Sequence, residues 1–169
     1  MRRLRLPLIT KRHWLPRPGD CVELLRNGSF EAGGLVSWSR IGNVSASTGR
    51  QSANGAILGG VNNAEGELWQ YIEVPADANY VPWTLWWKAE TTGPPGDDFL
   101  MVRLELEGEE PALLTFRPAT PPCDWSAIEA DLSPWAGKRL YAGFLVRTDG
   151  AVPTTFRIDD VSILACVRP

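Results

Sequence analysis

The sequence predicts an all-β protein, a sandwich of antiparallel sheets, on three observations. The chain of 169 residues holds 16 glycines and 14 prolines, and helix interiors exclude proline. Short segments in which apolar and polar residues alternate recur along the chain, as is typical of half-buried strands. Polar turns rich in proline and glycine separate these segments. Many short strands joined by such turns favour a β-sandwich over any helical fold.

Six segments have the pattern of strands, and we take them in chain order. They are residues 22–25, 68–74, 84–88, 100–107, 140–147 and 156–164. The first is followed by the turn dipeptide Asn27-Gly28, and the second is stopped by Pro75. A Gly-Pro-Pro-Gly loop at 93–96 follows the third. The fourth shows the clearest alternation of period two, and Asp149-Gly150 follows the fifth. We find no internal repeat and no second domain.

Charge divides the chain into two predicted regions. The first 18 residues carry six basic and no acidic side chains, whereas the remainder carries 11 basic and 20 acidic ones. We therefore expect a basic N-terminal arm over residues 1–19 and the sandwich over residues 20–169. The prolines of the arm favour extended structure over helix. Its candidate docking residues are Arg2, Arg3, Arg5, Lys11, Arg12, Trp14 and Arg17.

The arm has two interpretations. It is either a solvated tail or a segment that docks on an acidic partner, a nucleic acid or a neighbouring protein subunit. Its apolar residues favour a protein subunit, and the acidic body is not expected to bind nucleic acid. Arg5 and Pro7 interrupt the apolar stretch that a secretory signal peptide would need, so no signal peptide is expected. No apolar run approaches the roughly 20 residues of a membrane-spanning helix.

The residue types that catalysis requires are scarce. His13 is the only histidine, and it lies in the arm. The sequence contains no Cys/His metal cluster and no nucleophile elbow. Gly33-Gly34 and Gly59-Gly60 suit turns and do not have the spacing of phosphate-binding loops. We therefore expect a protein that is not an enzyme.

Several motifs together resemble a known family. They are Asn27-Gly28-Ser29-Phe30-Glu31, Trp38-Ser39, residues 131–137 and residues 156–163. In order and spacing, from about residue 21 to 166, they resemble the galactose-binding-like, MAM-like and carbohydrate-binding-module-like jelly rolls of bacterial accessory domains. The resemblance implies a jelly-roll sandwich of two antiparallel sheets. It also implies an extracellular, envelope or particle-associated location, and a fold that serves binding of several kinds.

The resemblance implies a disulfide. In this family the first and last strands lie side by side and antiparallel, with Asn27 near Asp159. Because opposite residues in an antiparallel pair keep a constant sum of their numbers, Cys21 then lies nearly opposite Cys166. Cross-strand neighbours are close enough to be bridged in an oxidising compartment. Cys123 would stay free. In a reducing cytosol all three would remain thiols.

The resemblance also implies a structural Ca²⁺ where the termini meet. The matching positions are Asn27, Glu31, Thr48, Asp159 and Asp160. Ca²⁺ prefers oxygen ligands from carboxylates and carbonyls. The alternative is that these acids only accept backbone hydrogen bonds. Since Asp159 and Asp160 point to opposite faces of a strand, one of them is the ligand, and we favour Asp160. Asp97-Asp98 is a weaker candidate that we expect to be solvated.

Eight tryptophans remain to be placed. Trp38, Trp87, Trp125 and Trp135 are expected in the core. If the apolar positions of each strand face inward, an unusually aromatic outer face is left for a ligand or partner. It comprises Trp69, Tyr71, Trp86, Arg103 and Tyr141.

Three interpretations of the aromatic face stay open. It can be an interface, because Trp, Tyr and Arg are enriched at interface centres. It can bind glycans, with rings stacked on sugars and Arg103, Glu73 and Glu105 bonded to hydroxyls. Loops or the arm can also cover it. Our expectation is a subunit or decoration protein of a larger extracellular, envelope or viral assembly. The alternative is a carbohydrate-binding module.

Overall fold

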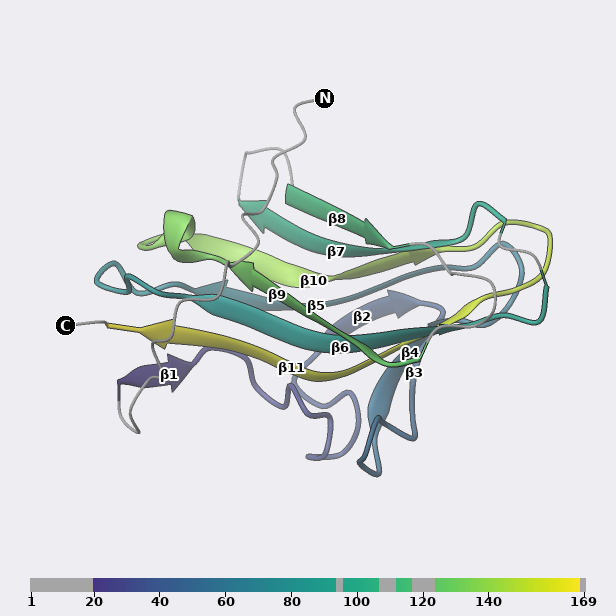
Figure 1. The fold of residues 1–169 in the computed structure, drawn as a ribbon, viewed down its shortest axis with the longest axis horizontal. Coiled ribbons are helices and arrows are strands. Elements are labelled where there is room, and N and C mark those ends of the chain that lie inside the picture. The colour runs from purple at the N-terminus through teal and green to yellow at the C-terminus, as the bar shows by residue number, and fades with distance from the viewer. Residues whose placement is uncertain (1–19, 94–95, 107–111, 117–123, 168–169) are drawn as a thin grey trace.

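The computed structural model of the chain is a sandwich of two antiparallel sheets, as predicted (Figure 1). It describes residues 20–93, 96–106, 112–116 and 124–167. The arm over residues 1–19 and Cys123 lie outside the described residues. Within them the only helical element is a 3₁₀ turn at Ser133–Trp135. No helix among the described residues has the length and apolarity that crossing a membrane requires.

Each sheet combines strands that are distant in sequence. One sheet has the order β3 (Val44–Ser47), β4 (Gly55–Gly59), β11 (Thr155–Cys166), β6 (Pro82–Glu90) and β9 (Ser126–Asp131), and β1 (Cys21–Glu23) pairs with β11 as the sixth strand. The other has the order β2 (Ser39–Gly42), β5 (Glu65–Glu73), β10 (Arg139–Arg147), β7 (Phe99–Leu106) and β8 (Ala112–Phe116). We call them the six-stranded and the five-stranded sheet.

The core lies between the sheets and confirms the predicted inward positions. Leu68, Leu85, Leu100 and Leu140 are all at most 1% exposed. Trp38 and Trp87 are buried as expected. The expectation that Trp125 and Trp135 are core residues was wrong, because both are only half-buried, although Trp135 packs against the edge of the core.

Five strands were not predicted from the sequence, namely β2, β3, β4, β8 and β9, and their burial and position explain why. All four residues of β2 and two of the four in β3 are exposed, so no apolar alternation marks them. Gly59, at the end of β4, was assigned to a turn from the sequence, and it does have a positive φ of 82°. In β8 and β9 only five or six residues pair at sheet edges. Such strands are defined by the backbone of their neighbours more than by their own side chains.

The two ends of the body meet as predicted. Cys21 and Cys166 are opposite one another in the β1–β11 pair. They form a disulfide, with the Cα atoms 4.1 Å apart. Beyond it, the Val167 N–H donates to the Asp20 carbonyl at 3.2 Å. The disulfide therefore closes the domain at the side of the six-stranded sheet.

Candidate functional site

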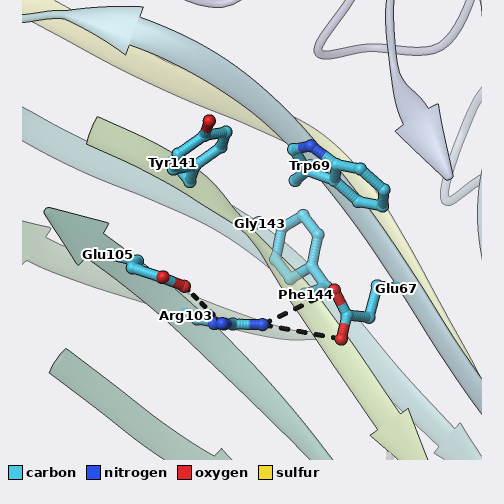
Figure 2. Close-up of a pocket in the computed structure, with 7 residues that line it drawn as sticks. All are labelled: Glu67, Trp69, Arg103, Glu105, Tyr141, Gly143 and Phe144. Carbon is cyan, nitrogen blue, oxygen red and sulfur yellow. Dashed lines mark hydrogen bonds and ion pairs between the residues drawn. The ribbon is translucent and has the colours of Figure 1, made fainter. Parts of the chain in front are cut away.

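The candidate site is a hollow on the outer face of the five-stranded sheet. It has a volume of about 320 Å³. Its lining comes from the three adjacent strands β5, β10 and β7. The residues are Glu67, Trp69, Arg103, Glu105, Tyr141, Gly143 and Phe144 (Figure 2). We call this the sheet hollow.

A missing side chain creates the sheet hollow. Gly143 on the central strand β10 is paired with Trp69 on one side and Arg103 on the other. A Cβ atom on Gly143 would lie 2.3 Å from the Leu68 carbonyl oxygen and 2.7 Å from the Trp69 Cβ. Only glycine fits this position while the β5–β10 pair keeps its present distance. The row across the sheet thus has an indole and a guanidinium with a gap between them.

Aromatic rings border the gap and extend it along the sheet. Trp69 is half-buried beside Gly143, and Tyr141, two residues along β10, is 41% exposed. Tyr71 pairs with Tyr141 across the strands. Their rings meet edge to face, with centroids 4.8 Å apart. Arg139 lies over Tyr71 at 5.4 Å from its centroid. These contacts hold the rings in place without a ligand.

Three charged groups form the polar side of the sheet hollow. The Nη1 of Arg103 lies 3.5 Å from both carboxylate oxygens of Glu67, and its Nη2 bonds to Glu105. About a third of each side chain is exposed. The guanidinium is thus held between two carboxylates from neighbouring positions of the sheet (Figure 2). We call this group the Arg103 cluster.

The arrangement has the parts of a binding site for a hydroxyl-rich ligand. A ring face attracts polarised C–H groups, and the free lone pairs of two carboxylates accept hydrogen bonds from hydroxyls. Acid–base hydrolysis of a glycoside, in contrast, needs one protonated and one free carboxyl group. Here both carboxylates are ion-paired with Arg103, which suits binding better than such catalysis.

One residue predicted for this face lies on the other sheet, and a second lies on this face but outside the sheet hollow. Trp86 is on β6 of the six-stranded sheet, so it faces outward on the opposite side of the sandwich. There the Arg50 guanidinium covers its ring at 4.1 Å. Glu73 lies on β5 but pairs with Arg139 and does not line the hollow. Trp69, Tyr141 and Arg103 are brought together as expected, with Tyr71 beside them.

Sequence reasoning missed Glu67 and Gly143 as site residues. Glu67 is recognisable only from its neighbours, because it reaches Arg103 across the intervening strand β10. A glycine at an outward position of an otherwise regular strand was the available signal for Gly143. Such a residue often marks a close approach of backbone or ligand.

The residues proposed for Ca²⁺ lie around the loop that joins β3 to β4. Asp159 is fully buried, and its Oδ2 accepts the Arg50 N–H at 2.6 Å and the Ser52 hydroxyl at 2.8 Å. Asp160, the ligand we favoured, instead pairs with the Arg50 side chain at 3.0 Å near the surface, so Asp159 is the buried acid of the two. A backbone bulge with a φ of 49° at Asp160 interrupts the alternation of β11 there, so Asp160 does not continue the buried row of Phe156 and Ile158.

The other three candidates have separate partners. Glu31 accepts the Asn54 N–H at 2.6 Å, and the Thr48 carbonyl accepts from Arg157 at 3.3 Å. Asn27 bonds to the Gly34 and Val36 carbonyls and accepts the Ala32 N–H, so its side chain organises its own turn. Among the described residues, no three His, Cys, Asp or Glu side chains converge as metal ligands.

Comparison with known proteins yields structural matches only. No family model matches the chain, and no curated protein matches it by sequence. The carbohydrate-binding module TmCBM61, solved in complex with β-1,4-galactotriose, is similar with a TM-score of 0.64 and 18% identity over 84% of this chain and 97% of that one. The K3 adhesin domain of Lys-gingipain from Porphyromonas gingivalis W83 is similar with a TM-score of 0.58 and 21% identity, over 84% of this chain and 98% of that one.

An enzyme also contains this fold as one part. The enzymatically active domain of tailspike protein 4 from bacteriophage CBA120 is similar with a TM-score of 0.55 and 15% identity. The match covers 83% of this chain but only 21% of that chain. The protein therefore has the jelly-roll sandwich fold of carbohydrate-binding modules and adhesin domains. At these identities the likeness establishes the fold, and function has to be argued from the site.

Proposed function

We propose that this domain is a carbohydrate-binding module that holds a glycan in the sheet hollow. The observation that carries the proposal is the gap at Gly143, which separates an indole from a guanidinium on an open sheet face. Trp69 and Tyr141 stack on sugar rings, and the Arg103 cluster bonds to hydroxyls. Pockets of this kind combine apolar walls with a few placed polar groups.

The fold supports this proposal more than the expected assembly subunit. TmCBM61 carries its galactotriose on a similar domain. The assembly interpretation depends on the arm over residues 1–19, which lies outside the described residues. It also used Trp86 as part of one face with Trp69, and these two side chains lie on opposite sides of the sandwich.

Glycan retention tests the proposal directly. The wild-type domain and the variants Trp69→Ala, Tyr141→Ala and Trp86→Ala are run on affinity gels that contain neutral polysaccharides, β-1,4-galactan among them. We expect retardation of the wild type by at least one polysaccharide. Trp69→Ala and Tyr141→Ala should abolish it, because stacked rings carry most of such contacts.

Trp86→Ala is the matched control, because it removes an indole from the opposite sheet and should leave retardation unchanged. All variants are first checked for native melting. Equal retardation of Trp69→Ala and wild type would show that the sheet hollow is not the site. Release of a bound protein subunit by Trp69→Ala, with no retardation by any glycan, would support the assembly interpretation instead.

We further propose a structural Ca²⁺ at Asp159 and Glu31, with carbonyls of the loop between them. The donors are hard oxygens that suit Ca²⁺, and Ser52 links the Asp159 carboxylate to the Asn54 carbonyl through bonds of 2.8 and 3.0 Å. Chelation should lower the melting temperature of the wild type, and added Ca²⁺ should restore it. Glu31→Gln should lose the part of this response that the Asp159 site contributes. A melting curve that chelator and Ca²⁺ leave unmoved contradicts the site.

We also infer that the domain works outside the cytoplasm. The disulfide between Cys21 and Cys166 supports this inference, because such bridges persist in oxidising compartments and are rare in the cytosol. Thiol labelling of protein recovered from its native source provides the measurement. Protection of both cysteines until reductant is added is expected, whereas two free thiols in the native material would contradict it.

A further inference from the structure

One end of the sandwich is closed by polar side chains that point into the core. The last paired residues at this end are Glu90 with Thr155 in the six-stranded sheet and Phe99 with Arg147 in the five-stranded one. Since side chains alternate, the next residue on each of the four chains points inward between the sheets. These residues, which we call the polar end layer, are Thr91, Asp98, Thr148 and Thr154, with exposed fractions of 8%, 0%, 4% and 0%.

Three of the four residues in the polar end layer have a side-chain oxygen without a hydrogen-bond partner. Four buried side-chain polar atoms in the described residues have none, and three of them belong to this layer. They are the Oγ1 atoms of Thr91 and Thr154 and the Oδ2 of Asp98. Thr148 is satisfied, since its hydroxyl donates to the Val61 carbonyl and accepts the Ala64 N–H. Buried polar groups are rarely left unpaired, so three at one end indicate a missing partner.

At Asp98 the missing partner is also a missing positive charge. Its Oδ1 accepts the Asp149 N–H at 2.6 Å, and no described cationic side chain contacts either oxygen. The sequence had suggested that Asp98 is solvated, which was wrong, because the residue is 0% exposed. Burying a carboxylate without a counter-charge is strongly unfavourable. Carboxylate oxygens are the ligands that hard cations prefer.

We propose that the polar end layer binds a hard cation, Ca²⁺ or Na⁺, through the Oδ2 of Asp98 and the hydroxyl oxygens of Thr91 and Thr154. The cation supplies the missing charge and satisfies the unpaired oxygens. It ties the β6–β7 connection to the β10–β11 connection, both of which cross between the sheets here. This site is separate from the one around Asp159, because the layer uses different strand ends and loops.

Thermal melting of the whole protein tests the proposal. Chelator-treated protein is titrated in two arms, one with CaCl₂ and one in which NaCl replaces choline chloride at constant ionic strength. We expect one cation to raise the melting temperature by about 5 °C or more at saturation. Asp98→Asn keeps the shape but removes the charge. In the Glu31→Gln background, in which the Asp159 site is disabled, it should abolish this rise. The arm that responds identifies the cation.

Two further variants keep the result interpretable. Thr91→Val preserves the side-chain shape and the carboxylate, so it should fold and shift the half-saturating concentration upward by about tenfold, the effect of one lost ligand. Glu31→Gln disables the Asp159 site, and it should retain the part of the rise in melting temperature that Asp98→Asn removes.

Two outcomes overturn the proposal. One is a melting temperature of the Glu31→Gln variant that neither cation moves, since this variant keeps the polar end layer intact. The other is an equal response of the wild type, Asp98→Asn and Thr91→Val to both cations. Either result would mean that Asp98 is satisfied by a proton or a water molecule and not by a metal ion.

Discussion

At the scale of single residues, Gly143 shapes the candidate site. Its neighbours across the sheet, Trp69 and Arg103, both carry large side chains. The space between them exists because a Cβ at this position would collide with backbone. The spacing of β5 and β10 and the volume of the sheet hollow therefore depend on the same residue. No larger residue can replace Gly143 without moving β5.

Gly143→Ala should accordingly reduce both stability and glycan binding. We expect a loss of about 1–3 kcal/mol in the free energy of unfolding, as for other overpacked positions, measured by urea denaturation. Gly150→Ala is the control, since a Cβ there lies 3.5 Å from the nearest atom and the residue has no positive φ. Similar losses for the two variants would refute the argument from close packing.

Arg103 shows how neighbouring charges prepare a side chain. Glu67 and Glu105 hold the guanidinium from two sides, so a glycan bound as proposed would meet a group that is already oriented. The same pairs are partly exposed, and exposed ion pairs contribute little to stability. We therefore attribute the value of the Arg103 cluster to binding and not to folding.

At the scale of elements, the disulfide joins the first and last strands of the body. It closes a loop with a sequence separation of 145 residues. The loop-entropy estimate for so long a loop is about 4–5 kcal/mol. Apart from the bridge, β1 is held by three paired residues and by hydrogen bonds that Glu23 accepts from the Ile163 N–H and the Ser162 hydroxyl.

The double variant Cys21→Ser/Cys166→Ser should therefore unfold at lower urea concentration than the wild type. Adding reductant should shift the wild type toward the variant and leave the variant itself unchanged. Identical urea midpoints for the oxidised wild type and the variant would mean that β1 holds without the bridge.

The pair β6–β11 carries a charge ladder on the other outer face. Glu90 accepts from Lys88 at 2.6 Å and from Arg157 at 2.7 Å. Burial raises the pKa of Glu90, but the hydrogen bonds and charges of Lys88 and Arg157 outweigh it and hold the pKa below its ordinary value of 4.5. A carboxyl whose pKa is lower in the folded state stabilises the fold above its unfolded pKa.

This stabilisation should disappear as the pH falls below 4.5 and through the folded-state pKa. Glu90→Gln should therefore show a smaller loss of stability between neutral and acidic pH than the wild type, measured by urea midpoints across that range. Glu65→Gln, from the exposed pair with Arg147, should keep the wild-type dependence. If both variants follow the wild-type curve, the ion pairs of Glu90 do not contribute to the pH dependence of stability.

At the scale of the whole molecule, the two outer faces differ in what covers them. On the six-stranded sheet, Arg50 covers Trp86, and the loop between β3 and β4 covers Asp159. On the five-stranded sheet the sheet hollow and the tyrosine pair are open. The two ends of the body meet beside β1 and β11 in the six-stranded sheet (Figure 1).

The sequence by itself determined which side chains of the main strands face inward, because alternation is a local property of extended chain. Together with the resemblance to jelly rolls, it also predicted the pairing of Cys21 with Cys166. Trp69, Tyr141 and Arg103 followed from the same alternation as outward residues. The inward and outward assignments needed no knowledge of which strands are neighbours, whereas the cysteine pairing took the neighbouring first and last strands from the resemblance.

Only the tertiary structure decided which sheet each strand joins. Alternation separates inside from outside but does not distinguish the two outer faces of a sandwich, so Trp86 and Trp69 were placed together although they lie on opposite sides. A bulge that no local pattern marks decided that Asp159 and not Asp160 is buried. Glu67 reached Arg103, and Gly143 became a gap, because strands distant in sequence pair at one register.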